Sequence, residues 1–298
     1  MRRSLVALLT MLCACQRSAM PRPARSDIPI GARAVVLQGD GVRLRAFEWP
    51  GSGTPLVLLH GLGGNAATWT SFARQVAGRH VIAVDLPGHG ESPVALTWDF
   101  APMARQILGA VQGRWPGAHI WVGHSWGGKL AVAVAALDSA ETRGLVLVDA
   151  VQASALAFDP PPFVERLFAG ELDPWPTLDS ALASASRLPQ YSPWTPDVAL
   201  AFRRAVTVQP DGRVVPLLAR GKAVAIMATF AQDLSGSANV LRIPVLVLSQ
   251  PKSPFEGAQR KLFPTATYVT VEGNHWLQIS NVSATSNAVT AWLQQHHL

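Results

Sequence analysis

The sequence predicts an α/β domain with a mostly parallel, eight-stranded sheet, helices on both faces of the sheet, and an inserted helical cap. Short apolar, β-branched runs alternate along the chain with helical stretches, which is the order that parallel strands and right-handed crossovers require. Runs such as Pro55-Leu-Val-Leu-Leu59 are apolar without alternation, as expected for strands covered on both faces. In such a sheet we expect the active site at the carboxyl ends of the strands.

The predicted core of the domain consists of two segments, residues 32–150 and 241–298. Its candidate strands are Ala34–Leu37, Arg43–Glu48, Leu56–His60, His80–Asp85, Ile120–His124, Leu145–Asp149, Val245–Ser249 and Thr267–Val271. Its candidate helices are Thr68–Ala77, Phe100–Gln112, Ser125–Leu137 and Val282–Gln295.

The alternation of strands and helices breaks between residues 151 and 240. Proline clusters such as Pro160-Pro-Pro162 and Pro174-Trp-Pro176 separate short Ala-, Leu- and Phe-rich helical pieces, and no strand pattern is visible. We expect a mainly helical cap that lies over the strand ends. A long connection that only covers the sheet is the alternative.

The N-terminus reads as a targeting segment of residues 1–14. Met1-Arg2-Arg3 is charged, and the apolar stretch that follows is too short to span a bilayer. Leu12-Cys-Ala-Cys15 resembles the signal of a bacterial lipoprotein, which predicts cleavage before Cys15 and lipidation of that residue. An ordinary secretory signal is the alternative. Residues 15–31, rich in Arg, Pro and Ala, are expected to form a tether. These features predict an exported protein of the bacterial cell envelope, lipid-anchored to a membrane and facing the periplasm or exterior.

Composition limits the classes of function. The chain has 298 residues, of which 49% are hydrophobic, enough for one large core. Its formal net charge is +6, but it has no dense Lys/Arg tract, so we predict no nucleic-acid partner and at most attraction to an anionic membrane surface. No HExxH, CxxC, Walker-type or dinucleotide-binding motif is present, so no metal or cofactor is predicted.

The most informative motif is Gly123-His-Ser125-Trp-Gly127, which follows an apolar strand and precedes an Ala/Val-rich helix. A strand, a tight turn and a helix in this order are typical of a nucleophile elbow. The two glycines let strand and helix pass closely. We therefore predict that Ser125 is a nucleophile, with an ordinary structural turn as the alternative.

Two further loops fit the same chemistry. His60-Gly-Leu62-Gly-Gly64 follows a strand, and the amides of Leu62 and Trp126 are expected to form an oxyanion hole. His275 follows the last strand and precedes the final helix. The imidazole pKa near neutrality suits it as the base that takes the proton of Ser125. The other histidines begin strands, flank glycine turns or lie at the C-terminus.

Taken together, these motifs and Asp85-Leu-Pro-Gly-His-Gly-Glu-Ser92 resemble the α/β-hydrolase superfamily, and most of all its capped esterases, haloperoxidase-like enzymes and C–C hydrolases. The resemblance covers about residues 32–298. It implies the α/β-hydrolase fold and a serine, acid and histidine triad, and it implies a structural role for the Asp85–Ser92 turn. It does not specify a substrate.

The acid is where the chain departs from this family. The usual acid follows the strand at Val245–Ser249, but Ser253 stands at that position. A neutral hydroxyl cannot stabilise the imidazolium that forms during catalysis. Some members take the acid from the end of the preceding strand, where this chain has Asp149. We predict Asp149 as the acid. Glu256, or a Ser–His dyad or inactive site without an acid, remains the alternative.

The sequence therefore predicts a serine hydrolase that cleaves a carboxylic ester of a mainly apolar small molecule through an acyl-enzyme. C–C hydrolysis or perhydrolysis is an alternative within the enzyme class. Outside it, the chain could be a non-catalytic ligand-binding lipoprotein that kept the elbow and lost the acid.

Overall fold

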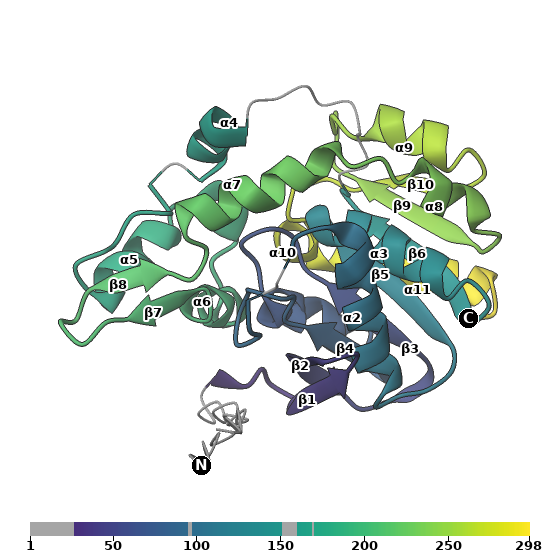
Figure 1. Cartoon of the computed structure of the whole chain (residues 1–298), viewed down its shortest axis with the longest axis horizontal. Helices are drawn as coiled ribbons and strands as arrows, with labels where there is room; N and C mark the ends of the chain where they lie inside the picture. The colour runs from purple at the N-terminus through teal and green to yellow at the C-terminus, as the bar shows by residue number, and fades with distance from the viewer. Residues whose placement is uncertain (1–26, 95–96, 151–159, 169) are drawn as a thin grey trace, which may run out of the picture.

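The computed structural model describes residues 27–94, 97–150, 160–168 and 170–298 (Figure 1). Its main sheet has eight strands in the order β1-β2-β4-β3-β5-β6-β9-β10. The strands are β1 (Arg33–Gly39), β2 (Val42–Trp49), β3 (Ser52–Leu59), β4 (Arg79–Val84), β5 (His119–His124), β6 (Thr142–Val148), β9 (Val245–Ser249) and β10 (Thr267–Thr270). Strand β2 pairs antiparallel with β1 and β4, and the other pairs are parallel. The predicted fold class is confirmed.

Helices cover both faces of this sheet. The core helices are α1 (Thr70–Gln75), α2 (Phe100–Gln112), α3 (Trp126–Leu137), α9 (Glu256–Leu262), α10 (Leu277–Ser280) and α11 (Val282–Gln295), and the short 3₁₀ helix η2 spans Ala66–Trp69. Helices α2 and α11 have the predicted bounds. The predicted helix Thr68–Ala77 is instead divided between η2 and α1, and α3 begins one residue later than predicted because Ser125 forms the turn before it.

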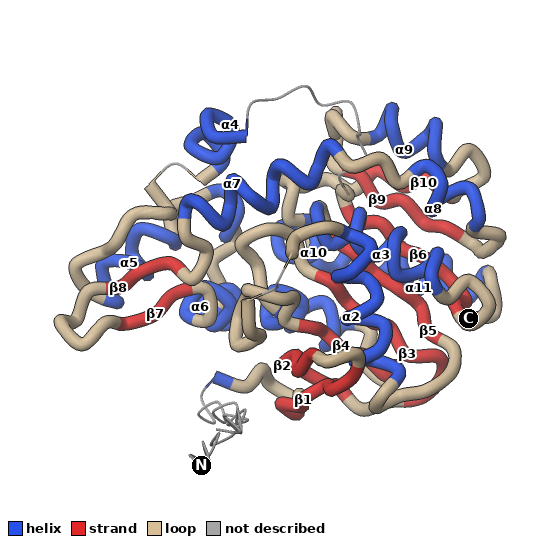
Figure 2. The backbone as a smooth tube through the Cα atoms, viewed as in Figure 1, coloured by secondary structure: helices blue, strands red, loops and turns tan. Residues whose placement is uncertain are grey.

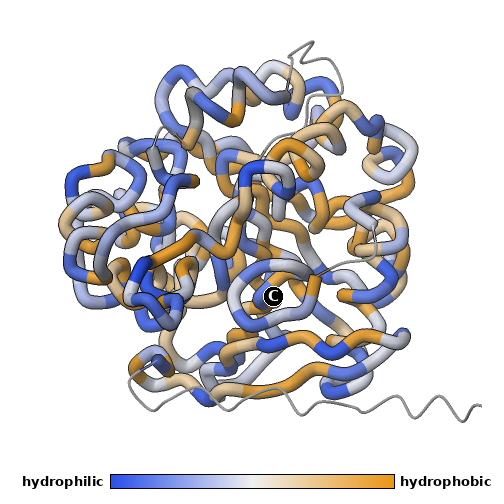
Figure 3. The backbone as a smooth tube through the Cα atoms, turned by 60° about the vertical axis from the view of Figure 1, so that its left-hand side comes forward, coloured by the Kyte–Doolittle hydropathy of each residue, from blue (hydrophilic) through white to orange (hydrophobic). Residues whose placement is uncertain are grey.

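The central strands are buried on both faces, as their continuous apolar runs indicate. Along β3, Val57 and Leu59 pack with α2 and α3, whereas Leu56 and Leu58 pack with α1 and α11. In Figure 3 hydrophobic segments accordingly run through the middle of the molecule. Burial on both faces fixes the sheet, so the loops at its carboxyl edge stand on a rigid base.

Between β6 and β9 the described chain forms helices and one hairpin. The helices are α4 (Pro160–Leu167), α5 (Leu178–Ala185), α6 (Pro196–Arg203), α7 (Arg220–Ala228) and α8 (Ser235–Val240), and the 3₁₀ helices are η3 (Pro189–Tyr191) and η4 (Thr229–Ala231). Trp175, Phe202 and Val214 belong to a small separate core in this region.

The hairpin corrects the sequence interpretation, which found no strand pattern between residues 151 and 240. Strands β7 (Val206–Val208) and β8 (Val214–Pro216) pair antiparallel (Figure 2). Each has three residues, too few for a period of two to be recognised. Trp175 extends the pairing through a bridge to Val214, a contact between distant residues that local pattern does not indicate.

The predicted signal segment, Cys15 and most of the predicted tether lie outside the described residues. The last tether residues, 27–31, contact the domain: the indole N–H of Trp49 donates to the carbonyl of Ile30 at 3.1 Å, and Ile28 packs on the core. Among the described helices, none is both long and apolar enough to cross a bilayer.

Candidate active site

Ser125 forms the turn between β5 and α3. Its backbone has φ 53° and ψ −121°, a strained conformation for a residue with a side chain. The turn is tight enough that a Cβ on Gly123 would lie 2.4 Å from the carbonyl oxygen of Gly127. This geometry leaves Ser125 at the carboxyl edge of the sheet, at the start of a helix whose dipole favours negative charge.

A chain of hydrogen bonds joins Ser125, His275 and Asp149. The Nε2 of His275 lies 2.9 Å from Ser125 Oγ, and its Nδ1 lies 2.6 Å from Asp149 Oδ2. Asp149 is fully buried at the end of β6, and 28% of the His275 side chain is exposed. With the Nδ1 proton donated to the carboxylate, Nε2 is free to accept the proton of Ser125. Glu256 does not take part, since it pairs with Arg260 one turn along α9.

The loop after β9 holds the buried carboxylate in place. Ser253 Oγ donates to Asp149 Oδ1 at 2.6 Å, and Gln250 Nε2 donates to Oδ2 at 3.0 Å. Ser253 occupies the position where the sequence resemblance led us to expect the acid. It donates to the carboxylate of Asp149, which the sequence predicts as the acid. Asp149 itself has φ 39°, a backbone conformation that points its carboxyl from the end of β6 toward His275.

His124, the residue before Ser125, holds the loop that carries His275. Its side chain is fully buried, and its Nε2–H donates to the carbonyl of His275 at 2.8 Å. Burial, and to a lesser degree the nearby His275, lowers the pKa of His124 well below its ordinary value. The imidazole is therefore neutral at physiological pH and positions His275 through the backbone. Its ring also packs on Trp276, 4.7 Å between centroids.

The loop after β3 packs directly against Ser125. A Cβ on Gly61 would lie 3.1 Å from the Cβ of Ser125. Leu62 lines the same cavity as Ser125, and Trp126 begins α3, so its amide belongs to the first turn, where N–H groups have no acceptor within the helix. His60 braces this loop: its Nε2 accepts from the amide of Leu86 at 3.0 Å, and burial lowers its pKa to about 4.

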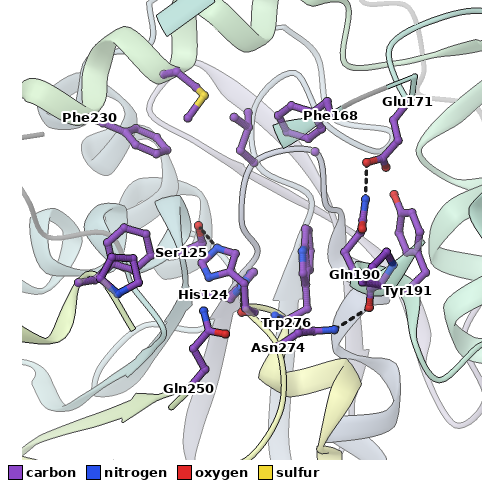
Figure 4. Close-up of a pocket in the computed structure, with 17 residues that line it drawn as sticks. His124, Ser125, Phe168, Glu171, Gln190, Tyr191, Phe230, Gln250, Asn274 and Trp276 are labelled. Carbon is purple, nitrogen blue, oxygen red and sulfur yellow. Dashed lines mark hydrogen bonds between the residues drawn. The ribbon is translucent and has the colours of Figure 1, made fainter. Parts of the chain in front are cut away.

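Ser125 and His275 open into a cavity of about 340 Å³ (Figure 4). Most of its lining is apolar or aromatic, with a few polar side chains. The described lining residues are Leu62, Gly63, His124, Ser125, Phe168, Glu171, Pro189, Gln190, Tyr191, Met227, Phe230, Gln250, Pro254, Phe255, Asn274, His275 and Trp276. The cavity therefore lies between the carboxyl edge of the sheet and the region from α4 to η4.

No group of three or more His, Cys, Asp or Glu within the described ranges could hold a metal ion.

Sequence reasoning missed several residues of this site. Gln250 and Ser253 contact Asp149, which lies more than 100 residues earlier in the sequence. His124 was identified only as a residue beside a glycine turn. Glu171 lies in the region without a recognisable pattern. The one available signal was Ser253 itself, since a hydroxyl at an expected acid position suggests that the acid comes from elsewhere.

The geometry agrees with the comparisons to known proteins. The model of the Alpha/beta hydrolase family matches residues 56–287, so the chain belongs to that family. This range contains the elbow, the loop after β3, the segment between β6 and β9, and the His275 loop.

Curated relatives include esterases and lipases. The chain is 38% identical to Lipase 1 of Psychrobacter immobilis over 128 residues, which are 42% of this chain and 40% of the lipase. It is 38% identical to an esterase of Mycobacterium tuberculosis over 122 residues, which are 38% of each chain. The alignments thus span about two fifths of the length of these relatives.

Solved structures share the fold over most of the chain. E-2-(acetamidomethylene)succinate hydrolase has a TM-score of 0.76 at 20% identity and covers 88% of this chain and 99% of its own. A bacterial membrane phospholipase A has a TM-score of 0.69 at 22% identity and covers 90% of this chain and 87% of its own. At these identities the likeness bears on the fold.

Proposed function

We propose that the protein is a serine hydrolase that cleaves a carboxylic ester through an acyl-enzyme. The observation that carries this proposal is the hydrogen-bonded chain from Asp149 through His275 to Ser125, which opens into a mainly apolar cavity. A non-catalytic binding protein that had lost its acid would have no reason to keep a buried carboxylate 2.6 Å from the base. The esterase and lipase relatives support the same reaction class.

In the first step, Ser125 Oγ bonds to the ester carbonyl carbon while its proton passes to His275 Nε2. The carbonyl electron pair moves to its oxygen, which accepts hydrogen bonds from the amides of Leu62 and Trp126. Collapse of this intermediate breaks the bond to the alcohol oxygen, and His275 returns the proton to the departing alcohol. Asp149 stabilises the imidazolium between these two proton transfers.

In the second step, water attacks the acyl-enzyme. The oxygen of the water bonds to the acyl carbon while His275 Nε2 takes a proton from that water. The negative charge that develops on the carbonyl oxygen is again stabilised by the amides of Leu62 and Trp126. When the bond to Ser125 breaks, Oγ regains the proton and the carboxylic acid leaves. The same groups could serve perhydrolysis, with peroxide as the attacking molecule, or C–C hydrolysis. Esters follow more directly from the relatives named above.

Labelling with a fluorophosphonate tests the proposal without a choice of substrate. The wild type should be labelled at Ser125 and should hydrolyse p-nitrophenyl esters, and Ser125→Ala should lose both properties while its circular dichroism spectrum stays unchanged. Ser125 lies on a turn and contributes little to packing, so we expect the variant to fold. Turnover of a folded Ser125→Ala protein at the wild-type rate would refute the assignment of the nucleophile.

We further propose that the protein is exported and anchored in the cell envelope by a lipid on Cys15. Leu12-Cys-Ala-Cys15 after a short apolar segment supports this proposal. An anchor of this kind would place the hydrolase next to a membrane, where apolar esters concentrate.

A further inference from the structure

One wall of the cavity is polar and lies away from Ser125. The carboxyl group of Glu171 accepts a hydrogen bond from the side-chain amide of Gln190 and is hydrogen-bonded to the side chain of Tyr191. Gln190 and Tyr191 belong to η3, whereas Glu171 follows α4, so two separate elements of the region between β6 and β9 build the cluster. In Figure 4 these three side chains gather on one side of the cavity, and Ser125 lies on the other.

Glu171 is an acid without a basic counterpart in this cavity. The described lining residues include no lysine and no arginine, and Glu171 is the one carboxylate among them. Its hydrogen-bond partners are both neutral. Burial, which outweighs the hydrogen bonds from Tyr191 and Gln190, raises the pKa of Glu171 to about 7. The folded protein therefore keeps a carboxyl group in a site that does not compensate its charge.

Aromatic rings surround the same space. Phe168 and Tyr191 line the cavity beside Glu171, and the ring of Trp276 lies between Tyr191 and Ser125 in the view of Figure 4. Ring faces attract cations, most strongly where water is excluded. A carboxylate and aromatic faces in one cavity together favour an organic cation and disfavour an anion.

We propose that the cavity selects esters that carry an ammonium group, which lies against Glu171 while the ester carbonyl reaches Ser125. This inference rests on the proposed ester hydrolysis and adds the substrate class. The cation supplies the charge that the protein does not provide to Glu171, so part of the cost of burying the carboxylate is recovered when the substrate binds.

Matched pairs of esters test the proposal, because each pair differs in charge and little in shape. One pair is choline butyrate and 3,3-dimethylbutyl butyrate, with the cation in the alcohol. The other consists of p-nitrophenyl esters of 4-(trimethylammonio)butyrate and 5,5-dimethylhexanoate, with the cation in the acyl group. The measured quantity is the ratio of kcat/KM for the cationic ester to kcat/KM for its neutral partner. Both esters of a pair use the same Ser125 and His275. An effect of a substitution on the chemistry itself therefore cancels when the ratio of the variant is compared with the ratio of the wild type.

Glu171→Gln removes the charge and keeps the shape of the side chain. In at least one pair we expect this variant to lower the ratio by about tenfold or more, the effect of roughly one lost desolvated charge contact. Glu165→Gln is the matched control, since Glu165 lies exposed on α4 and pairs with Arg220 outside the cavity. It should leave the ratio unchanged. A ratio that is the same in the wild type and Glu171→Gln for both pairs would overturn the inference.

A binding measurement separates this inference from the proposed reaction. Calorimetry on Ser125→Ala with choline butyrate should give tighter binding than on the double variant Ser125→Ala/Glu171→Gln, whether or not the wild type turns over. If the wild type is neither labelled nor active but this difference in affinity is found, the reaction assignment fails and the cation site stands. Equal affinities of the two variants for choline butyrate and also for the p-nitrophenyl ester of 4-(trimethylammonio)butyrate would reject the cation site even in an active enzyme.

Discussion

At the scale of single residues, Asp149 is the most constrained group of the site. Its two carboxylate oxygens are hydrogen-bonded to three side chains, those of His275, Gln250 and Ser253. The last two are neutral and come from one loop, so they orient the carboxylate without competing for its charge. In the proposed mechanism the acid therefore comes from the end of β6, and the serine at the expected position of the acid holds it there.

We expect Asp149→Asn to lower kcat by about 10³–10⁴-fold, as the same change does in serine proteases. An amide can present its NH₂ group to Nδ1, which favours the wrong imidazole tautomer and cannot stabilise the cation. The measurement is kcat on one activated ester, with folding checked by circular dichroism. Glu256→Gln is the control, since its ion pair with Arg260 lies on α9. Loss of activity in the control and not in Asp149→Asn would reverse the assignment.

Glu171 should also make stability depend on pH. Its pKa is raised from 4.5 to about 7 by burial, so the unfolded chain releases this proton at lower pH than the folded protein does. From this group alone, the free energy of unfolding should fall as pH rises from about 4.5 to 7 and then level off. Glu171→Gln does not titrate, so its stability relative to the wild type should increase over that interval.

Urea denaturation of both proteins at pH 5 and pH 8 checks this expectation, because all other groups are shared and cancel in the difference. The advantage of Glu171→Gln should be larger at pH 8. A larger advantage at pH 5 would mean that Glu171 is more stable as the carboxylate in the folded protein, and would weaken the case for an uncompensated acid.

At the scale of elements, a buried ion pair ties α6 to the core. Arg204 directly follows this helix and pairs with Asp85 at 3.1 Å and with Glu91 at 2.6 Å, and its side chain is 5% exposed. Asp85 also accepts from the amide of Ala66 at 2.7 Å, at the start of η2. The turn after β4 is thus a structural junction, as the resemblance implied, and it fixes α6 beside the sheet.

Arg204→Met should destabilise the protein by about 3–5 kcal/mol, because Asp85 would remain buried without its cation. The apolar stem of methionine keeps part of the packing on Phe47, over whose ring the guanidinium lies at 4.6 Å. Chemical denaturation measures the change. The exposed neighbour Arg203→Met is the control and should shift stability by less than about 0.5 kcal/mol. Equal effects of the two variants would show that the buried pair contributes nothing specific.

At the scale of the whole molecule, the proposed anchor and the hydrolase domain are separate features. Residues 27–31 already contact the domain, through Ile28 and through the hydrogen bond from Trp49 to Ile30. The stretch available as a tether is therefore the one between Cys15 and Asp27.

Metabolic labelling with a fatty-acid analogue should tag the wild-type protein and leave Cys15→Ser untagged. The matched control is Cys13→Ser, which removes the other cysteine of this segment and keeps the proposed lipidation site. Labelled protein should fractionate with membranes. An unlabelled wild type recovered in the soluble fraction would leave only the ordinary secretory signal.

The sequence determined the features that depend on neighbours along the chain. The strand, turn and helix around Ser125 are local, because Gly123 removes a Cβ that would collide with the backbone of Gly127 and Gly128. Gly127 serves a distant contact instead, since its missing Cβ leaves room for the carbonyls of Leu59 and His60. The continuous apolar runs determined the parallel sheet, and α2 and α11 follow from uninterrupted helical segments. The short strands β7 and β8 were not predicted, since three residues are too few to show an alternation of apolar and polar side chains.

Only the tertiary structure decided which distant groups meet. Asp149 and Glu256 both lie between Ser125 and His275 in the sequence. Either one therefore fits the order of nucleophile, acid and base along the chain. The end of β6, with φ 39° at Asp149, points that carboxyl at His275, while α9 turns Glu256 toward Arg260. The cluster of Glu171, Gln190 and Tyr191 likewise joins two elements that no local pattern connects. Long-range contacts of this kind depend on how distant segments pack against each other, and local patterns in a single sequence do not predict that packing.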